Sequence, residues 1–551
     1  MSAAQYRPSD EVDFLVIGIG AAGGVMAKEL STAGFRVVAL EQGPWLHEKD
    51  FRHDEVAISF RAGIINDPKT RPNTFRKTPS ETPVHQQAVE YASLVGGGSV
   101  HFTANYWRFH PEDFREHSTW GAVPGADLRD WPITYDDLEP YYTKGEWDLG
   151  ISGLGGSNPF DGPRSKPYPL PPMPVKSSGV LFERGAKKLG LHPFPAPVAV
   201  LSKDYHGRAG CVHCGFCEAF GCEVGAKSST LAAVVPAAVK TGRCEIRPDS
   251  YVRKIEVGKN GRVTGAIYFD KNKKEIFQRA KVVVVCANGA ETPRLLLMSK
   301  SNAFPQGLAN SNGNVGKYLM FDNGGIAFGL FEHPLNEYKS IVVTRVLHDF
   351  YRSDPKRGYW GGGGLDSRFD YYPIGFALGG LPADGPQWGA EWKKTLAEYY
   401  THIGGTLAHA TCLAVEENSI SLDDSVKDAW GMPAMRVTFR NHPDDMKNID
   451  FLMARQKEIL AAAGAKKIWH DPTTTTETTY SRHLMGSCRM GDDPKLSVVD
   501  KWNRAHDVPN LFLVDGSSLV TSGRQQPTAT IQALAYRLAE HLEQVAKRGE
   551  L

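Results

Sequence analysis

Residues 12–43 read VDFLVIGIGAAGGVMAKELSTAGFRVVALEQG, and this stretch decides the fold. An apolar run, a glycine-rich turn, a segment of helical period and a second apolar run predict a strand, a helix and another strand. Gly18, Gly20 and Gly23 fill the G-x-G-x-x-G positions, which serve the turn, the approach of a pyrophosphate and helix packing. Glu41 ends the second strand, where a carboxylate accepts hydrogen bonds from a ribose. The stretch predicts a dinucleotide-binding α/β unit, and both NAD and FAD fit it.

The amino-acid composition limits the kinds of molecule that this chain is expected to bind. Its 551 residues include 63 Lys and Arg against 62 Asp and Glu, which disfavours a basic nucleic-acid binder and a disordered polyelectrolyte. No run approaches the roughly 20 apolar residues of a membrane helix, so we expect no transmembrane segment. The first residues show neither a signal peptide nor a twin-arginine pair. We therefore expect a small-molecule substrate and a cytoplasmic protein, unless a partner subunit carries the folded chain across a membrane.

Two later stretches extend the prediction. Residues 95–109, VGGGSVHFTANYWRF, form a second glycine loop that can lay backbone against a flat ring. Residues 282–299, VVVVCANGAETPRLLLMS, predict a buried strand of the same sheet, a turn at Asn288 and Gly289, and a helix beginning near Thr292. The proline-rich residues 159–174 predict an extended connector.

The order of these motifs resembles that of the glucose–methanol–choline (GMC) flavoprotein oxidoreductases over nearly the whole chain. The matching pieces are the opening unit, the second glycine loop, WPITYDDLEPYY (131–142), ANGAETPRLLLMS (287–299) and the C-terminal stretch from HLMGSCRMG (483–491) to QPTATIQALAYRLAE (526–540). Residues 166–174 and 211–229 look like those of bacterial gluconate, fructose, glucose and glucoside 3-dehydrogenases. Pyranose oxidase is a more distant relative that shares the form of the second glycine loop.

The resemblance implies an α/β fold, with a Rossmann-like FAD-binding domain and an α+β substrate domain built on an antiparallel sheet. The FAD-binding domain is expected from residues 10–110, 206–320 and 479–551, the second of which includes a cysteine loop. Residues 111–205 are expected to form connector and cap segments, and residues 321–478 the substrate domain. In that domain Tyr359, Trp360, Tyr371 and Tyr372 are candidates for stacking on a sugar ring.

The resemblance also implies FAD as the cofactor. Gly18, Gly20, Gly23 and Glu41 would hold its ADP half, and Asp515 would close the late strand NLFLVD beside the flavin. Residues along the isoalloxazine would be Gly97, Gly98, Ser99, His101, Thr103 and Asn105. His101 matches the histidine that is covalently joined to flavin in pyranose oxidase; the alternative is an aromatic residue that packs beneath the flavin without a bond.

His483 matches the catalytic histidine of the family. Oxidation of a carbinol needs a base beside the carbon that gives up hydride, and imidazole suits neutral pH. The family's second residue, a histidine or asparagine, is here Gln526, which can orient a hydroxyl but cannot act as a base near neutral pH. We therefore expect His483 to take the proton and Gln526 to position the substrate.

Four cysteines, Cys211, Cys214, Cys217 and Cys222, lie in one short loop. Their spacing is close to that of bacterial ferredoxins, which favours an iron–sulfur cluster. Structural zinc and free or disulfide-paired thiols are the alternatives. Resemblance to bacterial dehydrogenases implies a three-iron (3Fe-4S) rather than a four-iron (4Fe-4S) cluster, with Cys211, Cys217 and Cys222 as ligands and the role of Cys214 open.

Together these features predict an FAD-dependent dehydrogenase that oxidises a secondary hydroxyl of a sugar or glycoside to a ketone, with glycoside C3 preferred. Electrons would leave through the cluster to a cytochrome c-type acceptor. A small subunit with an export signal would carry the chain to the periplasm, the cytoplasm being the alternative. The competing hypotheses are a sugar oxidase of pyranose-oxidase type that uses oxygen, and a flavin electron-transfer subunit without its own substrate.

Overall fold

A computed structural model describes the chain except residues 1–3, 61–62, 323, 472–476 and 551. The opening stretch folds as predicted, into β1 (Val12–Ile17), α1 (Ala21–Thr32) and β2 (Val37–Leu40). These strands belong to a seven-stranded sheet of order β6-β2-β1-β9-β8-β7, in which β19 also pairs with β9. The other members are β6 (Cys244–Arg247), β7 (Tyr251–Val257), β8 (Val263–Phe269), β9 (Glu275–Val285) and β19 (Leu511–Leu513).

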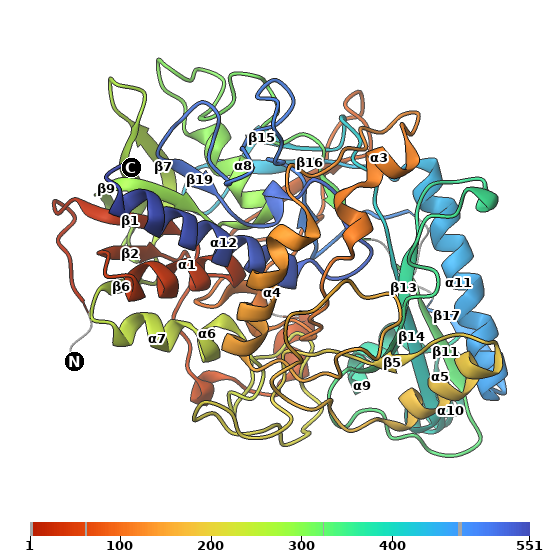
Figure 1. Ribbon diagram of the computed structural model, residues 1–551. Helices are drawn as coiled ribbons and strands as arrows, with labels where there is room; N and C mark the ends of the chain where they lie inside the picture. The colour runs from red at the N-terminus through yellow and green to blue at the C-terminus, as the bar shows by residue number, and fades with distance from the viewer. Residues whose placement is uncertain (1–3, 61–62, 323, 472–476, 551) are drawn as a thin grey trace.

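The pairing of this sheet is mixed. Strands β6, β2, β1, β9 and β19 pair in parallel, and β8 and β7 add an antiparallel extension. Strands β1 and β2 are mostly apolar and almost fully buried, because helices cover them. Helix α1 packs against α12 (Thr528–Lys547), which in turn packs against α4 (Tyr135–Leu149). Figure 1 shows these helices over the sheet on its left-hand side.

A second sheet forms the other half of the molecule and is antiparallel throughout, in the order β17-β11-β14-β13-β12-β5. Its strands are β5 (Phe194–Pro195), β11 (Ile326–Leu330), β12 (Val343–Leu347), β13 (Gly363–Arg368), β14 (Ile403–Ala410) and β17 (Lys467–His470). Helices α11 (Pro443–Ala463) and α5 (Ser177–Lys188) pack on it, as the right-hand side of Figure 1 shows. The predicted combination of a Rossmann-like domain and an antiparallel α+β domain is confirmed.

Two smaller sheets complete the β structure. Strands β15 (Ser419–Lys427), β16 (Pro433–Thr438), β3 (Asn73–Arg76) and β4 (Val84–His85) form one, and β10 (Met320–Phe321) pairs with β18 (Leu484–Met485) in the other. The remaining helices are α2 (Glu55–Phe60), α3 (Glu116–Trp120), α6 (Thr230–Ala233), α7 (Val235–Lys240), α8 (Asn288–Met298), α9 (Pro373–Gly375) and α10 (Gly389–His402). Single turns lie at Glu48–Asp50, Gly97–Val100, Pro111–Phe114, Pro355–Arg357, Phe376–Gly380 and Gly516–Ser518.

The predicted start of α8 near Thr292 is wrong, since the helix begins at Asn288. The side-chain oxygen of Asn288 accepts hydrogen bonds from the backbone N–H groups of Ala290 and Glu291, which caps the first turn. Pro293 lies inside the helix and cannot donate to the Gly289 carbonyl. Ser487 Oγ donates to that carbonyl instead, at 2.5 Å, so the early start leaves it satisfied.

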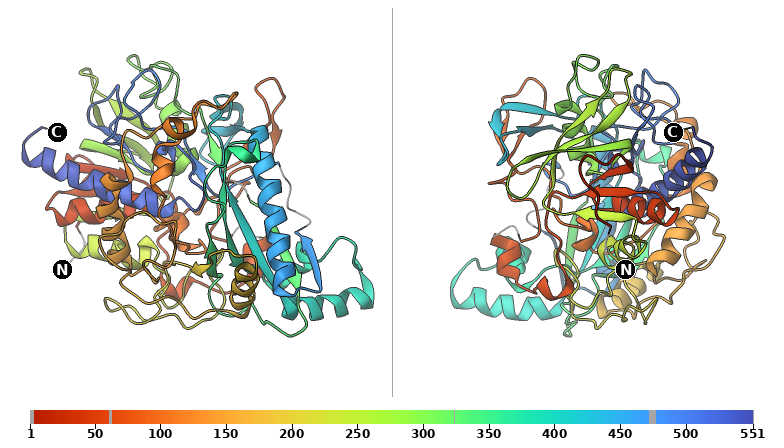
Figure 2. Two further views of the ribbon diagram at one scale, coloured as in Figure 1. Left: turned by 45° about the vertical axis from the view of Figure 1, so that its right-hand side comes forward. Right: turned by 90° about the vertical axis from the view of Figure 1, so that its left-hand side faces the viewer.

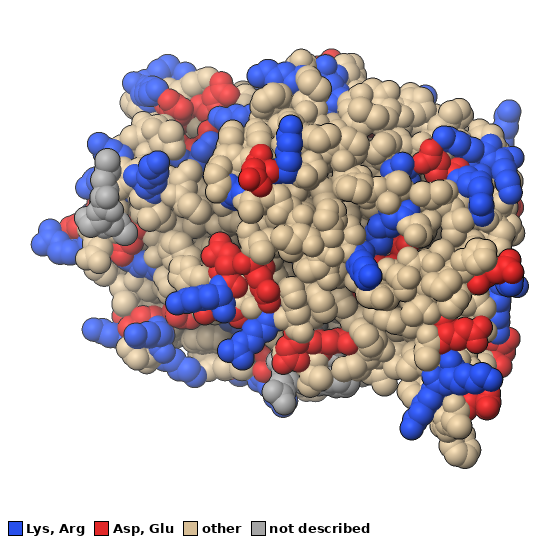
Figure 3. All heavy atoms as spheres, turned by 90° about the horizontal axis from the view of Figure 1, so that it is seen from below, with Lys and Arg blue, Asp and Glu red and all other residues tan. Residues whose placement is uncertain are grey.

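On the face seen from below, the protein surface shows no large patch of like charge. Lysine and arginine lie beside aspartate and glutamate there, among many uncharged residues (Figure 3). Helix α10 projects from the antiparallel half, as both views of Figure 2 show. In the described part of the chain, no helix is both long enough and apolar enough to cross a membrane. The predicted domain boundaries stay a prediction, although β5 of the antiparallel sheet comes from the expected connector.

Candidate active site

A cavity of about 490 Å³ lies where the two halves meet. Residues at the carboxyl ends of β1, β2, β9 and β19 line it, including Ile17, Leu40, Cys286 and Asp515. Ligands of open α/β sheets bind at this edge of the strands. Leu407, Ala408 and His409 of β14 face the cavity from the antiparallel sheet, so the cavity is bounded by both halves of the chain.

Backbone approaches backbone closely where the two glycine loops meet. A Cβ on Gly97, whose φ is +51°, would lie 2.7 Å from Gly20 Cα, so side chains are excluded there. Gly18, Gly20, Gly97 and Gly98 all line the cavity. Gly23 does not line it: its Cβ would lie 1.8 Å from the Gly18 carbonyl oxygen, which fits the packing role of the third glycine.

Glu41 lines the cavity and contacts the first glycine loop. Its two carboxylate oxygens accept hydrogen bonds from the backbone of Ile19 and Gly43, each at 3.0 Å. Burial raises the pKa of Glu41 to about 7 despite these bonds. A ligand hydroxyl that donates to this carboxylate would stabilise its charged form, as the predicted ribose contact requires.

The second glycine loop presents polar atoms that lack partners. His101 Nδ1 and both amide atoms of Asn105 are buried without a hydrogen bond, and Thr103 lines the cavity beside them. Burial, with Arg482 and Lys227, lowers the pKa of His101 to about 3, so this imidazole is neutral. Unpaired buried polar groups are rare in native proteins, which indicates that a polar ligand completes this wall.

The Ser99 hydroxyl is hydrogen-bonded within the protein. Although Ser99 lines the cavity, its hydroxyl donates to the Gly96 carbonyl at 2.6 Å and accepts from Thr230 N–H at 3.0 Å. The hydroxyl therefore holds the loop, and a contact of Ser99 with the cofactor stays a prediction. Asp515 acts similarly, since Thr292 Oγ1 and the Asn288 N–H donate to it at 2.6 and 3.1 Å and join the late strand to α8.

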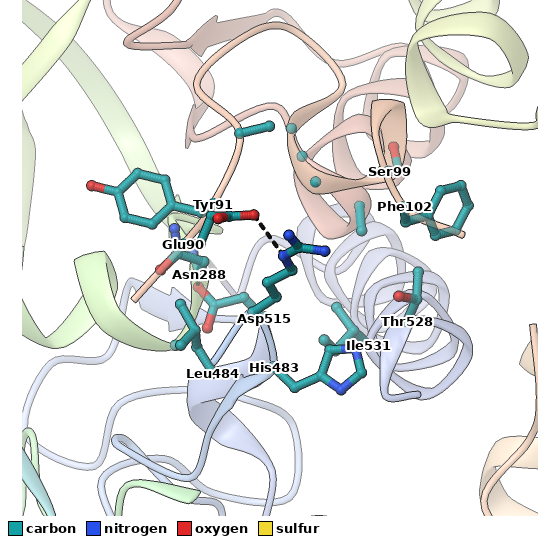
Figure 4. A pocket seen from close by; sticks show the side chains of 18 of the residues that line it. Glu90, Tyr91, Ser99, Phe102, Asn288, His483, Leu484, Asp515, Thr528 and Ile531 are labelled. Atoms are coloured by element: carbon teal, nitrogen blue, oxygen red, sulfur yellow. Dashed lines mark hydrogen bonds and ion pairs between the residues drawn. The ribbon is translucent and has the colours of Figure 1, made fainter. Parts of the chain in front are cut away.

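His483 faces the cavity from the residue before β18. Figure 4 shows its ring beside Ile531 of α12, with Asp515 and Asn288 further along the same wall. Its Nδ1 lies 2.7 Å from Asp322 Oδ2, so the carboxylate accepts the Nδ1–H and leaves Nε2 free to take a proton. Sequence reasoning missed Asp322, which has no motif of its own.

His409 was also missed. It is 2% exposed, and its Nε2 lies 2.8 Å from Asp366 Oδ2. Although burial raises the pKa of Asp366, the charges of Arg368 and His409 outweigh burial and hold that pKa below its usual value. Gln526 Nε2 lies 3.1 Å from His409 Nδ1, and Gln526 Oε1 is buried without a partner.

These contacts place two histidines on one wall of the cavity. His483 is paired with the carboxylate of Asp322, and His409 with that of Asp366. His409 Nδ1 also lies 4.0 Å from Asp322 Oδ2, which connects the two pairs. Gln526 comes within hydrogen-bond distance of the second histidine, as the contacts above show. The predicted pair of His483 and Gln526 therefore lines the cavity together, with two further polar groups that had no signal in the sequence.

The predicted aromatic platform is wrong. None of Tyr359, Trp360, Tyr371 and Tyr372 lines the cavity. Tyr372 stacks on Phe216 at 5.3 Å and donates to the Glu218 carbonyl, so it packs on the cysteine loop instead. The aromatic residues of the cavity are Tyr91, Phe102, Tyr251 and Tyr480.

The cysteine loop lies against the second glycine loop. Ala219 N–H donates to the His101 carbonyl at 2.8 Å, and buried Lys227 Nζ donates to the carbonyls of Cys217 and Phe102 at 2.6 and 3.2 Å. All four loop cysteines are free, with Cys217 buried, Cys211 and Cys222 partly buried and Cys214 exposed.

The sulfurs of this loop are not arranged as ligands of one ion. No three of them lie within 4.8 Å of one another in the described chain. Four thiolates on tetrahedral zinc would be about 3.8 Å apart. Burial raises the pKa of Cys217 to about 12, so a metal bound there must displace the thiol proton, which is released to solvent.

Comparison with known proteins identifies the family. Residues 12–321 and 414–535 match the N-terminal and C-terminal domains of the GMC oxidoreductases. The chain belongs to the GMC oxidoreductase family. It is 35% identical to 2-methyl-1,2-propanediol dehydrogenase of Mycolicibacterium austroafricanum, over 97% of this chain and 95% of that protein. The fructose dehydrogenase large subunit of Gluconobacter japonicus is 30% identical, with 98% of each chain covered.

Solved structures of this fold cover nearly the whole chain. Pyridoxine 4-oxidase from Mesorbium loti superposes with a TM-score of 0.64 at 18% identity, covering 97% of this chain and 99% of that one. Formate oxidase of Aspergillus oryzae gives a TM-score of 0.68 at 13% identity, with coverages of 98% and 100%. The family match and the relatives named above, rather than these structures, show that this GMC chain is an FAD-dependent oxidoreductase that acts on CH–OH groups of alcohol or sugar type. FAD fits the cavity, because close-packed glycines and unpaired polar atoms form its walls.

Proposed function

We propose that this GMC chain is a dehydrogenase that oxidises a secondary hydroxyl of a sugar or glycoside to a ketone, with glycoside C3 as the preferred position. The observation that carries the proposal is the wall on which His483, Gln526 and His409 meet. His483 offers its Nε2 and Gln526 its Oε1, while His409 holds the amide of Gln526, so this wall can bond two neighbouring hydroxyls of one substrate.

FAD, when bound, supplies the acceptor for the hydride. The chain's own part is to hold the hydroxyl and remove its proton. Asp322 fixes the ring of His483 so that Nε2 takes that proton, and the imidazolium then lies against the carboxylate at 2.7 Å. Gln526 Oε1, which lacks a partner, is available to a neighbouring hydroxyl.

We further propose that Cys211, Cys217 and Cys222, with Cys214 in an open role, hold an iron–sulfur cluster of the three-iron type that receives the electrons. Support comes from the bonds between the cysteine loop and the backbone of His101 and Phe102, because a carrier there would lie beside the flavin loop. In a cluster each thiolate binds a different iron, so sulfurs spread over a loop fit a cluster better than one zinc ion.

The name of one relative, the fructose dehydrogenase large subunit, indicates a protein that works with another subunit. By analogy we propose a small partner subunit with an export signal, a cytochrome c-type acceptor and a periplasmic location. Detection of the chain only in the cytosol, when its neighbouring subunits are co-expressed, would contradict this part of the proposal.

A small 1,2-diol is a second candidate substrate, which the 35% identity to 2-methyl-1,2-propanediol dehydrogenase favours. We would purify the protein anaerobically and follow flavin bleaching with glucosides, disaccharides, gluconate, fructose and 2-methyl-1,2-propanediol. Bleaching by a glycoside, with the 3-keto product found by mass spectrometry, supports the proposal. Bleaching by the diol alone would overturn the sugar assignment.

A separate experiment tests whether electrons leave the flavin through an iron–sulfur cluster. Iron and sulfide assays on the same preparation should find a cluster, and Cys217→Ser should abolish transfer to cytochrome c while sugar still bleaches the flavin. Cys244→Ser is the matched control, since Cys244 is also a buried free thiol and lies in β6. A preparation without iron that forms hydrogen peroxide during turnover would instead identify an oxidase.

A further inference from the structure

Two histidines and an aspartate gather outside the FAD cavity. His110, Asp161 and His348 each present one possible ligand atom, and these atoms lie within 4.8 Å of one another. The three come from distant parts of the chain: the turn before Pro111–Phe114, the proline-rich connector and the residue that follows β12. None of them lines the cavity that holds His483.

The histidines of this cluster are buried, and several of their ring nitrogens have no hydrogen-bond partner. The His110 side chain is 1% exposed, and neither of its ring nitrogens is within hydrogen-bond distance of a partner, Glu112 Oε1 lying 3.9 Å from Nδ1. His348 is 3% exposed, and its Nε2 also lacks a partner. A neutral imidazole has one N–H and one unprotonated nitrogen. His110 therefore buries a hydrogen-bond donor and an acceptor, and both lack a hydrogen bond. Such groups are rare in native proteins and indicate a missing ligand.

The distances within the cluster suit a shared ion. His110 Nε2 lies 3.9 Å from Asp161 Oδ1, which is too far for a hydrogen bond. Two ligands of one tetrahedral zinc ion, each bound at about 2.1 Å, lie about 3.4 Å apart, so small shifts of the side chains close the site.

One amide group already holds two of the three ligands together. Asn158 Nδ2 donates to Asp161 Oδ1 at 2.6 Å and to His348 Nδ1 at 3.0 Å. Its own oxygen accepts from Phe160 N–H at 3.1 Å, which sets the direction of the amide. These bonds hold Asp161 and His348 in position on one amide group.

We propose that His110, Asp161 and His348 bind a divalent transition-metal ion, zinc being the ion that best matches the donors. Two imidazoles and one carboxylate are a common zinc set, whereas calcium and magnesium prefer oxygen ligands. The ion would tie the connector to both halves of the molecule. It would also support the substrate wall, because the Trp107 ring lies 6.0 Å from His348 and 5.3 Å from His409.

The test measures metal in the flavin-loaded protein by mass spectrometry. We expect one zinc per chain that is absent from His110→Ala, and a zinc affinity at least about tenfold weaker in Asp161→Asn by chelator competition. Asp161→Asn keeps the size of the side chain, so it separates ligation from folding. His192→Ala is the control, since His192 forms an exposed pair with Asp349 at 2.7 Å.

Because the cysteine loop can also take up metal, the difference between wild type and variants is decisive. Equal zinc content and equal affinity in wild type and Asp161→Asn would overturn the proposal. A second measurement is the unfolding midpoint after chelation. Added Zn²⁺ should raise it in wild type and His192→Ala but not in the ligand variants, and no rise in wild type would also refute the site. Flavin content, measured in parallel, reports whether each variant folds.

Discussion

Asp322→Asn changes one atom type in the active site and tests the role of His483. In the wild type, Asp322 Oδ2 lies 2.7 Å from His483 Nδ1 and accepts its proton. An asparagine that turns its amide N–H toward Nδ1 makes this nitrogen the acceptor, so the ring proton moves to Nε2. The nitrogen that faces the substrate then cannot act as a base, although the shape of the site is preserved.

The expected loss follows from the base that is removed. General base catalysis contributes about 10²–10⁴ in rate, which is roughly 2.7–5.5 kcal/mol of barrier at 1.36 kcal/mol for each factor of ten. We expect the rate of flavin reduction by substrate to fall within this range. Single-turnover mixing without oxygen measures that step alone, and flavin content shows whether the variant still binds FAD.

A double variant makes the test specific. If Asp322 acts only through His483, then Asp322→Asn combined with His483→Ala should be no slower than His483→Ala alone. Asp322 also lies 4.0 Å from His409, so His409→Asn combined with Asp322→Asn serves as the comparison and should lose more than either single variant. A fall of less than tenfold in Asp322→Asn, or full additivity with His483→Ala, would refute this reasoning.

Three further outcomes are expected. Gly97→Ala should weaken FAD binding by about tenfold or more, because φ is +51° and the new Cβ would lie 2.7 Å from Gly20 Cα. Gly34→Ala is the control and should bind FAD normally, because Gly34 also has a positive φ, of +98°, but its Cβ would meet nothing within 4 Å. FAD affinity of the apoprotein should rise with pH up to about 7, since burial holds the pKa of Glu41 there and ribose hydroxyls favour the charged form; Glu41→Gln should remove this slope in fluorescence titrations, and an unchanged slope would contradict it. His409→Asn should lower kcat/KM about tenfold or more while flavin content stays constant, and unchanged kinetics would place this histidine outside the substrate site.

The sequence was sufficient to predict those parts of the fold that depend on contacts between residues close together in the chain. The glycine spacing of residues 18–23 predicts β1, α1 and β2, because backbone contact tolerates no side chain there. The start of α8 was missed by four residues, since the cap is the side chain of Asn288 and the gap left by Pro293 is filled by Ser487, far away in the chain. Such a compensation has no local signal.

The substrate side of the site was the least predictable. Asp322 and His409 have no motif, and their meaning depends on strand pairing between distant segments. The aromatic residues of 359–372 were misleading, because they fill small cores: Trp360 packs with Leu413 and Val123, and Tyr372 with Phe216. Aromatic content alone does not separate a core from a sugar platform.

The smallest sheet of the protein explains how the proposed base is positioned. Strands β10 and β18 pair in antiparallel register, Met320 with Met485 and Phe321 with Leu484. The next residues along this ladder are Asp322 and His483, so backbone pairing alone brings the carboxylate opposite the imidazole. Asp322 leads directly into the antiparallel half of the molecule, whereas His483 returns the chain to the FAD-binding half. The dyad is therefore fixed by backbone pairing at the junction of the two halves.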